Sequence, residues 1–341
     1  MKRSVSNNRK HVININGRRD LVVEGGMSLF ETLKREQIFL PSACGGRGKC
    51  GLCRLKVISG GGPSNQIEKS HLSAKESVEG VRLSCQVKVE NDIRIEIPPE
   101  LLSIREHTAI CTRITDLTHD IKEFRLELNK NDEFKYVPGQ YIQLRCPKYN
   151  GNEEVYRAYS ISSNPMDRNA IELMIRLTPN GICTTWCFNY LKEGDIVQFE
   201  GPHGNFCLSD TDAPIVFVAG GSGMAPIKCM LHHMKNTGNN RKATFFFGLN
   251  LANELFAADL MKQFERDLPN FSFVPVIAQP ENQSHWTGET GLVTEALKRN
   301  LKDASLHEAY LCGSPGMIDA AIITLTELGI PKGKIFYDRF A

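Results

Sequence analysis

Four cysteines near the N-terminus have the residue type and spacing of a metal-binding loop. Cys44, Cys50 and Cys53 lie within ten residues among four glycines, and Cys85 supplies a fourth thiol from a later segment. Thiolates are the ligands of iron–sulfur clusters, and four of them satisfy a [2Fe–2S] unit. Glycines allow the sharp turns that point backbone N–H groups at anionic sulfur. The pattern predicts a [2Fe–2S] cluster held by these four cysteines.

A zinc site and reversible disulfides would also use a group of cysteines. The spacing favours both less than a [2Fe–2S] cluster. Plant-type [2Fe–2S] loops have the spacing C-x₄-C-x₂-C with a distant fourth ligand, whereas the first gap here has five residues, so the match is close but incomplete. A Cys₄ zinc site usually presents two C-x₂-C pairs, and this segment has one, Cys50 and Cys53. Reversible disulfides rank below zinc. The other seven of the eleven cysteines are scattered singly, as small buried side chains often are.

A glycine-rich turn later in the chain is suited to phosphate. The segment AGGSGMAP, residues 219–226, follows an apolar strand and opens a helix, so its glycines let a pyrophosphate approach the helix N-terminus. Pro226 stands where the G-x-G-x-x-G fingerprint has its last glycine, which argues against a Rossmann dehydrogenase. Gly313 lies in a second strand-to-helix turn, LCGSPG. Two such turns at strand ends mark a ligand crevice, although a tight turn needs glycine even without a ligand.

A third candidate site is Arg157-Ala158-Tyr159-Ser160 on a predicted strand. A planar guanidinium suits pyrophosphate, an aromatic ring can stack on a flavin, and a hydroxyl can reach the ring nitrogens. Gly181 and Thr184 lie where a loop or a helix start could donate N–H groups to phosphate. Each of these signals is weak alone, because arginine and tyrosine on a strand are usually surface and core residues.

The pattern of elements divides the chain into several parts. A hairpin at 11–24, a helix at 29–37 capped by Ser28 and strands at 52–58, 82–90 and 93–97 predict a β-grasp domain. Six strands between residues 109 and 201 predict an antiparallel barrel, and strands alternating with helices from 215 to 328 predict a doubly wound parallel sheet. The expected fold class is thus multidomain α+β, β and α/β. The expected parts are a polar tail (1–10), a ferredoxin-like domain (11–98), a linker (99–105), an FAD-binding barrel (106–209) and an NAD-binding domain (210–341).

Composition narrows the class further. The chain has 341 residues, a net charge of +2 and 41% hydrophobic residues, so it is globular and gives no sign of binding nucleic acid or an anionic membrane. No run of 18 apolar residues occurs, and the first residues are basic and polar without the apolar core of a signal peptide. We therefore expect a cytoplasmic protein without a transmembrane segment.

The motifs R-x-Y-S, G-G-x-G-x-x-P and C-G-x-P, in this order, resemble those of the ferredoxin–NADP reductase superfamily with a fused N-terminal ferredoxin domain. The chain is most similar to FAD-carrying subunits of sodium-translocating NADH:quinone reductases and to reductase components of phenol and methane monooxygenases. By this resemblance Ser160 would face flavin N5 and Cys312 the hydride-donating carbon as the catalytic pair. The implied FAD-binding residues are Arg157, Ala158, Tyr159, Ser160, Gly181, Thr184 and Phe340; those for the dinucleotide are Gly220, Gly221, Gly223, Pro226, Cys312 and Gly313.

The resemblance implies that hydride passes from NADH to FAD and single electrons pass to the cluster and then to a protein acceptor. NADH is favoured over NADPH because no Arg or Lys follows Asn250 until Lys262, although Arg241 or Lys242 could fold back. An oxygenase is one expected partner. The quinone-reductase subunit has an N-terminal membrane helix that is not seen here, so we expect a soluble acceptor. Docking on a membrane complex through protein contacts is an alternative. A non-catalytic electron-carrier module is another. The electron-transfer component of dihydroorotate dehydrogenases matches less well, because its cluster follows the nucleotide domain.

Overall fold

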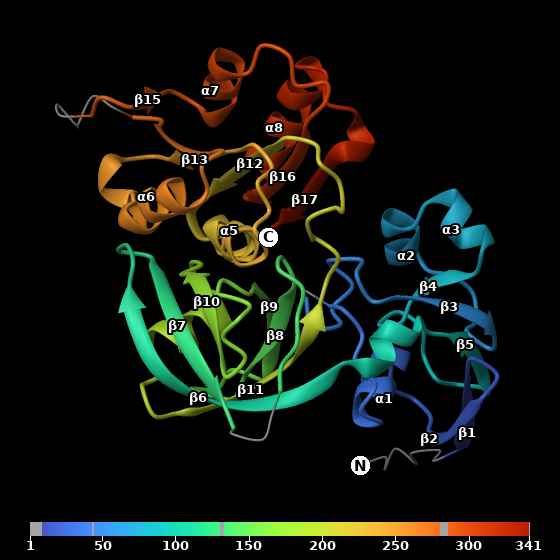
Figure 1. Ribbon diagram of the computed structural model, residues 1–341. Coiled ribbons are helices and arrows are strands. Elements are labelled where there is room, and N and C mark those ends of the chain that lie inside the picture. The colour runs from blue at the N-terminus through green and yellow to red at the C-terminus, as the bar shows by residue number, and fades with distance from the viewer. Residues whose placement is uncertain (1–8, 43, 130–132, 280–285, 341) are drawn as a thin grey trace. The chain divides into compact units, whose positions relative to one another are not determined.

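The computed structural model describes residues 9–42, 44–129, 133–279 and 286–340 (Figure 1). These residues form three sheets, and the chain divides into two compact units. Unit 1 contains residues 1–107, 142–158 and 198–203, and unit 2 contains 108–141, 159–197 and 204–341. Within the described ranges, no helix has both the length and the apolar character needed to cross a membrane. The domain boundaries expected from the sequence stay predictions.

The N-terminal sheet has the mixed topology of a β-grasp fold. Its strand order is β2-β1-β5-β3-β4, with β5 parallel to β1 and the other pairs antiparallel. Helix α1 (Leu29–Arg35) begins after Ser28, whose Oγ accepts from the Glu31 N–H at 3.2 Å. Leu29 and Leu33 of α1 are fully buried against the sheet. The strands are β1 (Lys10–Ile15), β2 (Arg19–Glu24), β3 (Arg54–Ser59), β4 (Val81–Leu83) and β5 (Ile93–Glu96).

Several local predictions in this region were wrong. The strand expected at 82–90 is only β4, because the chain turns where the Gln86 N–H donates to the Leu83 carbonyl at 2.8 Å. Helix α1 also ends two residues earlier than expected. Two short helices, α2 (Gln66–His71) and α3 (Ala74–Val78), were not predicted, and a 3₁₀ helix, η1 (Pro99–Ser103), occupies the expected linker.

The second sheet is antiparallel, as predicted for the barrel. Its strand order is β10-β7-β6-β11-β8-β9, and β7 pairs with β10 over seven residues from Ile121 to Glu127. Apolar side chains alternate along β7, where Phe124 and Leu126 are buried. Helix α4 (Ile182–Asn189) follows β10 and begins after Gly181, where the sequence allowed either a loop or a helix start. The strands are β6 (Arg105–Asp116), β7 (Ile121–Leu128), β8 (Tyr141–Cys146), β9 (Val155–Ser160), β10 (Ala170–Arg176) and β11 (Ile196–His203).

The third sheet is parallel and doubly wound, which confirms the predicted α/β class. Its order is β15-β14-β13-β12-β16-β17, with α5 and α6 on one face and α7 and α8 on the other (Figure 1). Strand β17 was not predicted. The strands are β12 (Ile215–Gly220), β13 (Ala243–Leu249), β14 (Phe271–Ile277), β15 (Glu289–Thr290), β16 (Glu308–Gly313) and β17 (Ile335–Arg339); the helices are α5 (Met224–Thr237), α6 (Ala258–Asp267), α7 (Val293–Asn300) and α8 (Pro315–Glu327).

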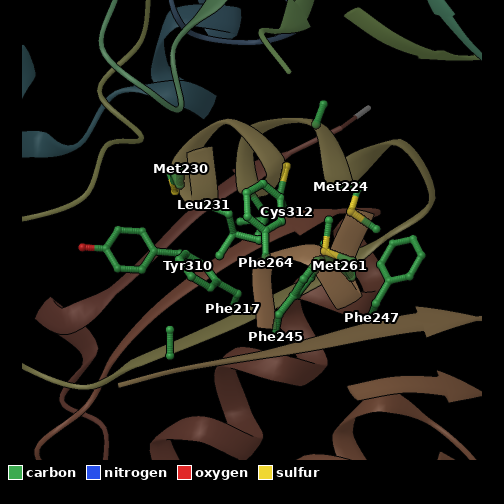
Figure 2. Packing of buried hydrophobic residues seen from close by; sticks show 14 of the residues in the cluster. Phe217, Met224, Met230, Leu231, Phe245, Phe247, Met261, Phe264, Tyr310 and Cys312 are labelled. Atoms are coloured by element: carbon green, nitrogen blue, oxygen red, sulfur yellow. The ribbon is translucent and has the colours of Figure 1, made fainter. Parts of the chain in front are cut away.

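An aromatic core lies between this sheet and α5 and α6 (Figure 2). Phe217, Phe245, Phe247 and Tyr310 have no exposed surface. Strands of a parallel sheet are covered on both faces, so β12 and β13 are almost continuously apolar. Burying each aromatic side chain stabilises the fold by about 2–3 kcal/mol. Cys312 belongs to the same core, which fixes the end of β16 next to the first turn of α5.

Candidate functional site

The four predicted cluster cysteines are brought together by the antiparallel strands β3 and β4 and by the glycine-rich loop before β3. Arg54 pairs with Leu83 across the two strands, so Cys53 and Cys85 lie at adjoining strand ends. The Ser84 N–H and hydroxyl both donate to the Cys53 carbonyl, at 2.9 and 3.0 Å. Cys44 and Cys53 are buried, whereas Cys50 and Cys85 are half-buried, and all four are free thiols.

The thiols form two pairs. Cys44 and Cys50 are hydrogen-bonded to each other, as are Cys53 and Cys85. The bond from Cys50 lowers the pKa of Cys44 to about 4, and that from Cys53 lowers the pKa of Cys85 to about 7. Backbone N–H groups also point at the sulfurs: those of Arg47 and Lys49 at Cys44, of Leu52 at Cys50 and of Gly48 at Cys85. The same two thiol bonds, together with burial, raise the pKa of Cys50 and Cys53, so one sulfur of each pair is favoured as the thiolate and the other as the thiol.

The paired arrangement fits two iron atoms better than one zinc ion. Each iron of a [2Fe–2S] cluster takes two protein thiolates, whereas structural zinc needs four ligands around one centre. Among the described residues, no three His, Cys, Asp or Glu side chains are gathered as they would be around a single ion. Gly46 and Gly48 adopt positive φ angles of 80° and 74°, which let the loop aim its N–H groups inward. The residues present therefore fit the cluster.

The turn between β12 and α5 lies against the end of β16. A Cβ atom on Gly223 would lie 2.3 Å from the Cys312 carbonyl oxygen, so a side chain there has no room. The Met224 N–H at the start of helix α5 bonds back to the Gly221 carbonyl, but no side chain caps the helix, which leaves its N-terminus open to an anionic ligand. Pro226 occupies the first turn of α5, where its missing N–H costs no helical hydrogen bond. The geometry thus suits a pyrophosphate approaching this turn.

A cavity of ≈ 260 Å³ opens at this turn, at the carboxyl ends of the parallel strands. Its lining includes Gly220 and Gly221 of the predicted turn and Ser314 of the second turn. Arg176 of β10 also lines it, and a Cβ on Gly221 would lie 3.2 Å from Arg176 Nη1. Arg176 Nε donates to Asp120 Oδ2 at 2.6 Å. The cavity is at the position where doubly wound sheets bind their ligands.

A larger open groove, ≈ 710 Å³, is in unit 1 and contains none of the motif residues. Four of its five charged lining residues are paired, Arg54 with Glu76 at 3.2 Å and Lys56 with Glu96 at 3.0 Å. We therefore take the smaller cavity of unit 2 as the candidate dinucleotide site, because Gly220 and Gly221 of the predicted turn line it.

Asp338, which was not predicted as a site residue, lies between Ser160 and Cys312. Ser160 Oγ donates to Asp338 Oδ2 at 3.4 Å, and Asp338 on β17 is the register partner of Cys312 on β16. Desolvation raises the pKa of Asp338 to about 6, even though the residue keeps part of its surface exposed and Ser160 donates to it. Burial and the nearby Asp338 raise the pKa of Cys312, so this thiol stays protonated. The three side chains form a group with an exchangeable proton.

The remaining predicted residues lie at strand and helix ends. Arg157, half-buried on β9, donates from Nη1 to its neighbour's carbonyl, Tyr156 O, at 2.7 Å. Gly181 is the N-cap of α4 and leaves that helix without a side-chain cap, while Thr184 in its first turn accepts from the Thr178 N–H at 3.2 Å. Uncapped N–H groups and a guanidinium are what FAD phosphates need, so the residues fit this cofactor. Ala158 and Tyr159 are half-buried on β9. The Phe340 N–H donates to Gly313 O at 2.9 Å.

Comparisons with protein families agree with the assignment of one part of the chain to each cofactor. The chain matches three families: the 2Fe-2S iron-sulfur cluster binding domain at residues 13–90, the oxidoreductase FAD-binding domain at 108–207 and the oxidoreductase NAD-binding domain at 217–322. These matches confirm the three cofactors. They define the class of the protein as an FAD- and NAD-binding oxidoreductase with a [2Fe–2S] domain.

Similarity to known proteins extends over nearly the whole chain. The F subunit of the Na(+)-translocating NADH-quinone reductase is 33% identical in Pseudomonas aeruginosa, over 96% of this chain and 90% of the relative, and 34% identical in Neisseria meningitidis, over 96% and 91%. The chain belongs to the family of reductases that includes this relative. An Amycolatopsis cytochrome P450 reductase superposes with a TM-score of 0.79 and 26% identity, covering 97% of this chain and 98% of that one. The ferredoxin reductase of a carbazole 1,9a-dioxygenase shares the fold at 22% identity, with a TM-score of 0.74 over 98% and 99%.

Three residues of the site were missed or undervalued in the sequence. Asp338 lies two residues before Phe340 in the segment YDRF, and an acid directly after the apolar run Ile-Phe-Tyr was the available signal. Arg176 gave no signal, because its position over Gly221 depends on contacts between distant segments. Glu254 lies in the stretch after Asn250 that was considered only for its lack of Arg and Lys, but its carboxylate accepts from the Asn250 N–H at 2.9 Å at the cavity rim.

Proposed function

We propose that the protein oxidises NADH and delivers the electrons singly, through its cluster, to a protein acceptor. The observation that carries this proposal is the convergence of Ser160, Asp338 and Cys312 next to the nucleotide turn of Gly223. Bound FAD supplies the chemistry that accepts a hydride and releases single electrons. The protein orients the flavin and nicotinamide rings and holds or releases one proton.

In this proposal Ser160 and Cys312 are the catalytic pair and Asp338 supports both. The Ser160 hydroxyl donates to Asp338, so the carboxylate fixes the direction of that hydroxyl. The raised pKa of Asp338 lets it hold or release a proton close to neutral pH. Cys312, fully buried and protonated, closes the nicotinamide end of the site to water. Phe340 is proposed to cover the flavin, supported by its bond to Gly313.

The other proposed contacts divide between the two ligands. Arg157, Ala158 and Tyr159 on β9, with Gly181 and Thr184 at the start of α4, would bind FAD. Gly220, Gly221, Gly223, Pro226 and Gly313 would bind the dinucleotide, and Arg176 would assist at its pyrophosphate. Cys44, Cys50, Cys53 and Cys85 would ligate the cluster.

Charge at the cavity supports NADH over NADPH. Glu254 holds the turn after β13, where doubly wound sheets place the adenosine ribose, and a carboxylate there favours a 2′-hydroxyl over a 2′-phosphate. Arg241, which could have supplied a cation, is buried and bonded to Glu308 at 2.7 Å. Arg176 is the one cation among the described residues that line the cavity, and Asp120 neutralises it.

The acceptor is proposed to be an oxygenase or another redox enzyme of the cytoplasm. Similarity to a cytochrome P450 reductase supports a protein acceptor. Similarity to the F subunit of the Na(+)-translocating NADH-quinone reductase favours a second candidate, in which the protein docks on a membrane complex.

An anaerobic visible spectrum before and after one equivalent of NADH or NADPH tests the proposal. Bleaching of flavin and iron–sulfur bands, faster with NADH, is the expected result. A matched Glu254→Gln variant should lose part of its preference for NADH, because the carboxylate charge is removed. Flavin absorption without cluster absorption, with zinc found by metal analysis, would contradict the electron path. Unreduced flavin after NADH addition would instead favour a non-catalytic carrier.

A further inference from the structure

The side chain after the fourth cysteine turns back onto that cysteine. Gln86 Nε2 donates to Cys85 Sγ at 3.4 Å, a contact within the normal range for sulfur acceptors. Both residues are half-buried in the turn that follows β4. The Gly48 N–H points at the same sulfur, so Cys85 has one backbone N–H donor and one side-chain N–H donor in addition to the Cys53 thiol.

The orientation of the Gln86 amide is fixed by its other end. Gln86 Oε1 accepts from Asn65 Nδ2 at 3.0 Å. Asn65 is the N-cap of α2, and its Oδ1 is already used to accept from the Glu68 N–H at 3.0 Å. Asn65 can therefore offer only its NH₂ group to Gln86. A reversed Gln86 amide would place two NH₂ groups face to face and an oxygen against the sulfur.

The series of hydrogen bonds from Cys85 through Gln86 to Asn65 continues to a buried ion pair, Glu68 with Arg82. Glu68 has no exposed surface and binds Arg82 through both oxygens, at 2.7 and 2.8 Å. Glu68 also accepts from the Asn65 N–H at 3.0 Å and the Leu83 N–H at 3.1 Å. Arg82 is on β4, three residues before Cys85. The pair thus holds the start of α2 against the strand that leads to the cluster.

We propose that Gln86 raises the reduction potential of the [2Fe–2S] cluster by donating to Cys85, and that Asn65 positions it for this purpose. Reduction adds negative charge to the cluster and its sulfur ligands. An N–H dipole aimed at a ligand sulfur stabilises that charge and makes reduction easier. The inference rests on the proposed role of Cys85 as a ligand.

Gln86→Met tests the donor, because methionine has a similar length but no N–H. The cluster potential is measured in the complete protein by anaerobic redox titration, following the electron paramagnetic resonance signal of the reduced cluster. We expect a lower midpoint potential for Gln86→Met and a still lower one for Gln86→Glu, which places an acceptor beside the sulfur. Asn65→Asp keeps the helix cap but loses the NH₂ group, and should give a smaller shift in the same direction.

Gln66→Met is the matched control, because Gln66 is an exposed neighbour in α2. Its midpoint should equal that of the unchanged protein. An unchanged midpoint in both Gln86 variants, with full iron and sulfide content, would overturn the inference. If the Gln86 variants assemble no cluster, the redox titration of Asn65→Asp tests the inference instead. An unchanged midpoint potential in Asn65→Asp would also overturn it. A wild-type protein without the reduced-cluster signal would overturn the ligand assignment itself.

Discussion

The cluster loop and the nucleotide turn both present bare N–H groups to an anionic group, but they are supported in opposite ways. The loop around Cys44 and Cys50 lies near short helices and a polar network that ends at the Glu68–Arg82 pair. The turn at Gly223 is held by packed backbone and by an aromatic core with no exposed surface. The difference shows that similar chemistry can depend on hydrogen bonds in one place and on close packing in the other.

Substituting one proposed cluster ligand should separate the two regions most completely. We expect Cys50→Ser to remove nearly all visible absorption of the cluster while NADH still reduces the flavin, because none of the described residues that line the nucleotide cavity belongs to unit 1. Anaerobic spectra and iron content measure both effects. Simultaneous loss of flavin reduction would show that the two regions depend on each other.

A side chain at Gly223 should have the next largest effect, now on the packed region. Gly223→Val places atoms against the Cys312 carbonyl, so we expect flavin reduction by NADH to slow about 100-fold, or about 3 kcal/mol in the barrier. The cluster should still assemble. Gly316→Ala is the control, because a Cβ there meets nothing within 4 Å. Stopped-flow bleaching of the flavin gives the rates, and a near-normal rate for Gly223→Val would refute the packing argument.

Breaking the buried Glu68–Arg82 ion pair should lower the stability of the region around the cluster loop without slowing hydride transfer. Glu68→Gln leaves Arg82 without its buried partner and should destabilise the ferredoxin part by about 3 kcal/mol. Thermal loss of cluster absorption reports this stability. The control is Glu79→Gln, whose exposed contact with Lys75 at 3.9 Å should contribute less than about 0.5 kcal/mol. Equal melting of the two variants would contradict the role of the pair.

The smallest expected effect concerns the pH dependence of the nucleotide region. The pKa of Asp338 is about 6 in the folded protein and 3.8 ordinarily, so the folded state binds more protons between these values. Stability therefore falls as pH rises from about 4 to 6. We expect a loss of about 1–2 kcal/mol, reduced from the full shift because Asp338 is partly exposed. Asp338→Asn should remove this loss and Asp319→Asn, at an exposed site, should not. Unfolding measured at pH 4.5 and pH 7 distinguishes them.

The sequence was most informative where its signals were local. Continuous apolar strands and glycine turns located the parallel sheet, and the cysteine spacing located the cluster loop. Helices α2 and α3 were missed because five or six residues cannot show a helical period, although the capping boxes Asn65–Glu68 and Ser73–Glu76 were readable. Asp338 was missed because its importance arises from strand register with Cys312, a long-range pairing that sequence periodicity does not encode.

The burial of the cysteines makes thiol-reactive reagents a probe of cluster loading. Cys312 is completely buried and its pKa is raised, so alkylating agents should not reach it in the folded protein. Cys50, Cys85 and Cys207 are the three half-buried thiols among the eleven. Bound iron would protect Cys50 and Cys85 and leave Cys207 to react. The number of labelled thiols would then report the fraction of molecules that carry the cluster, independently of their colour.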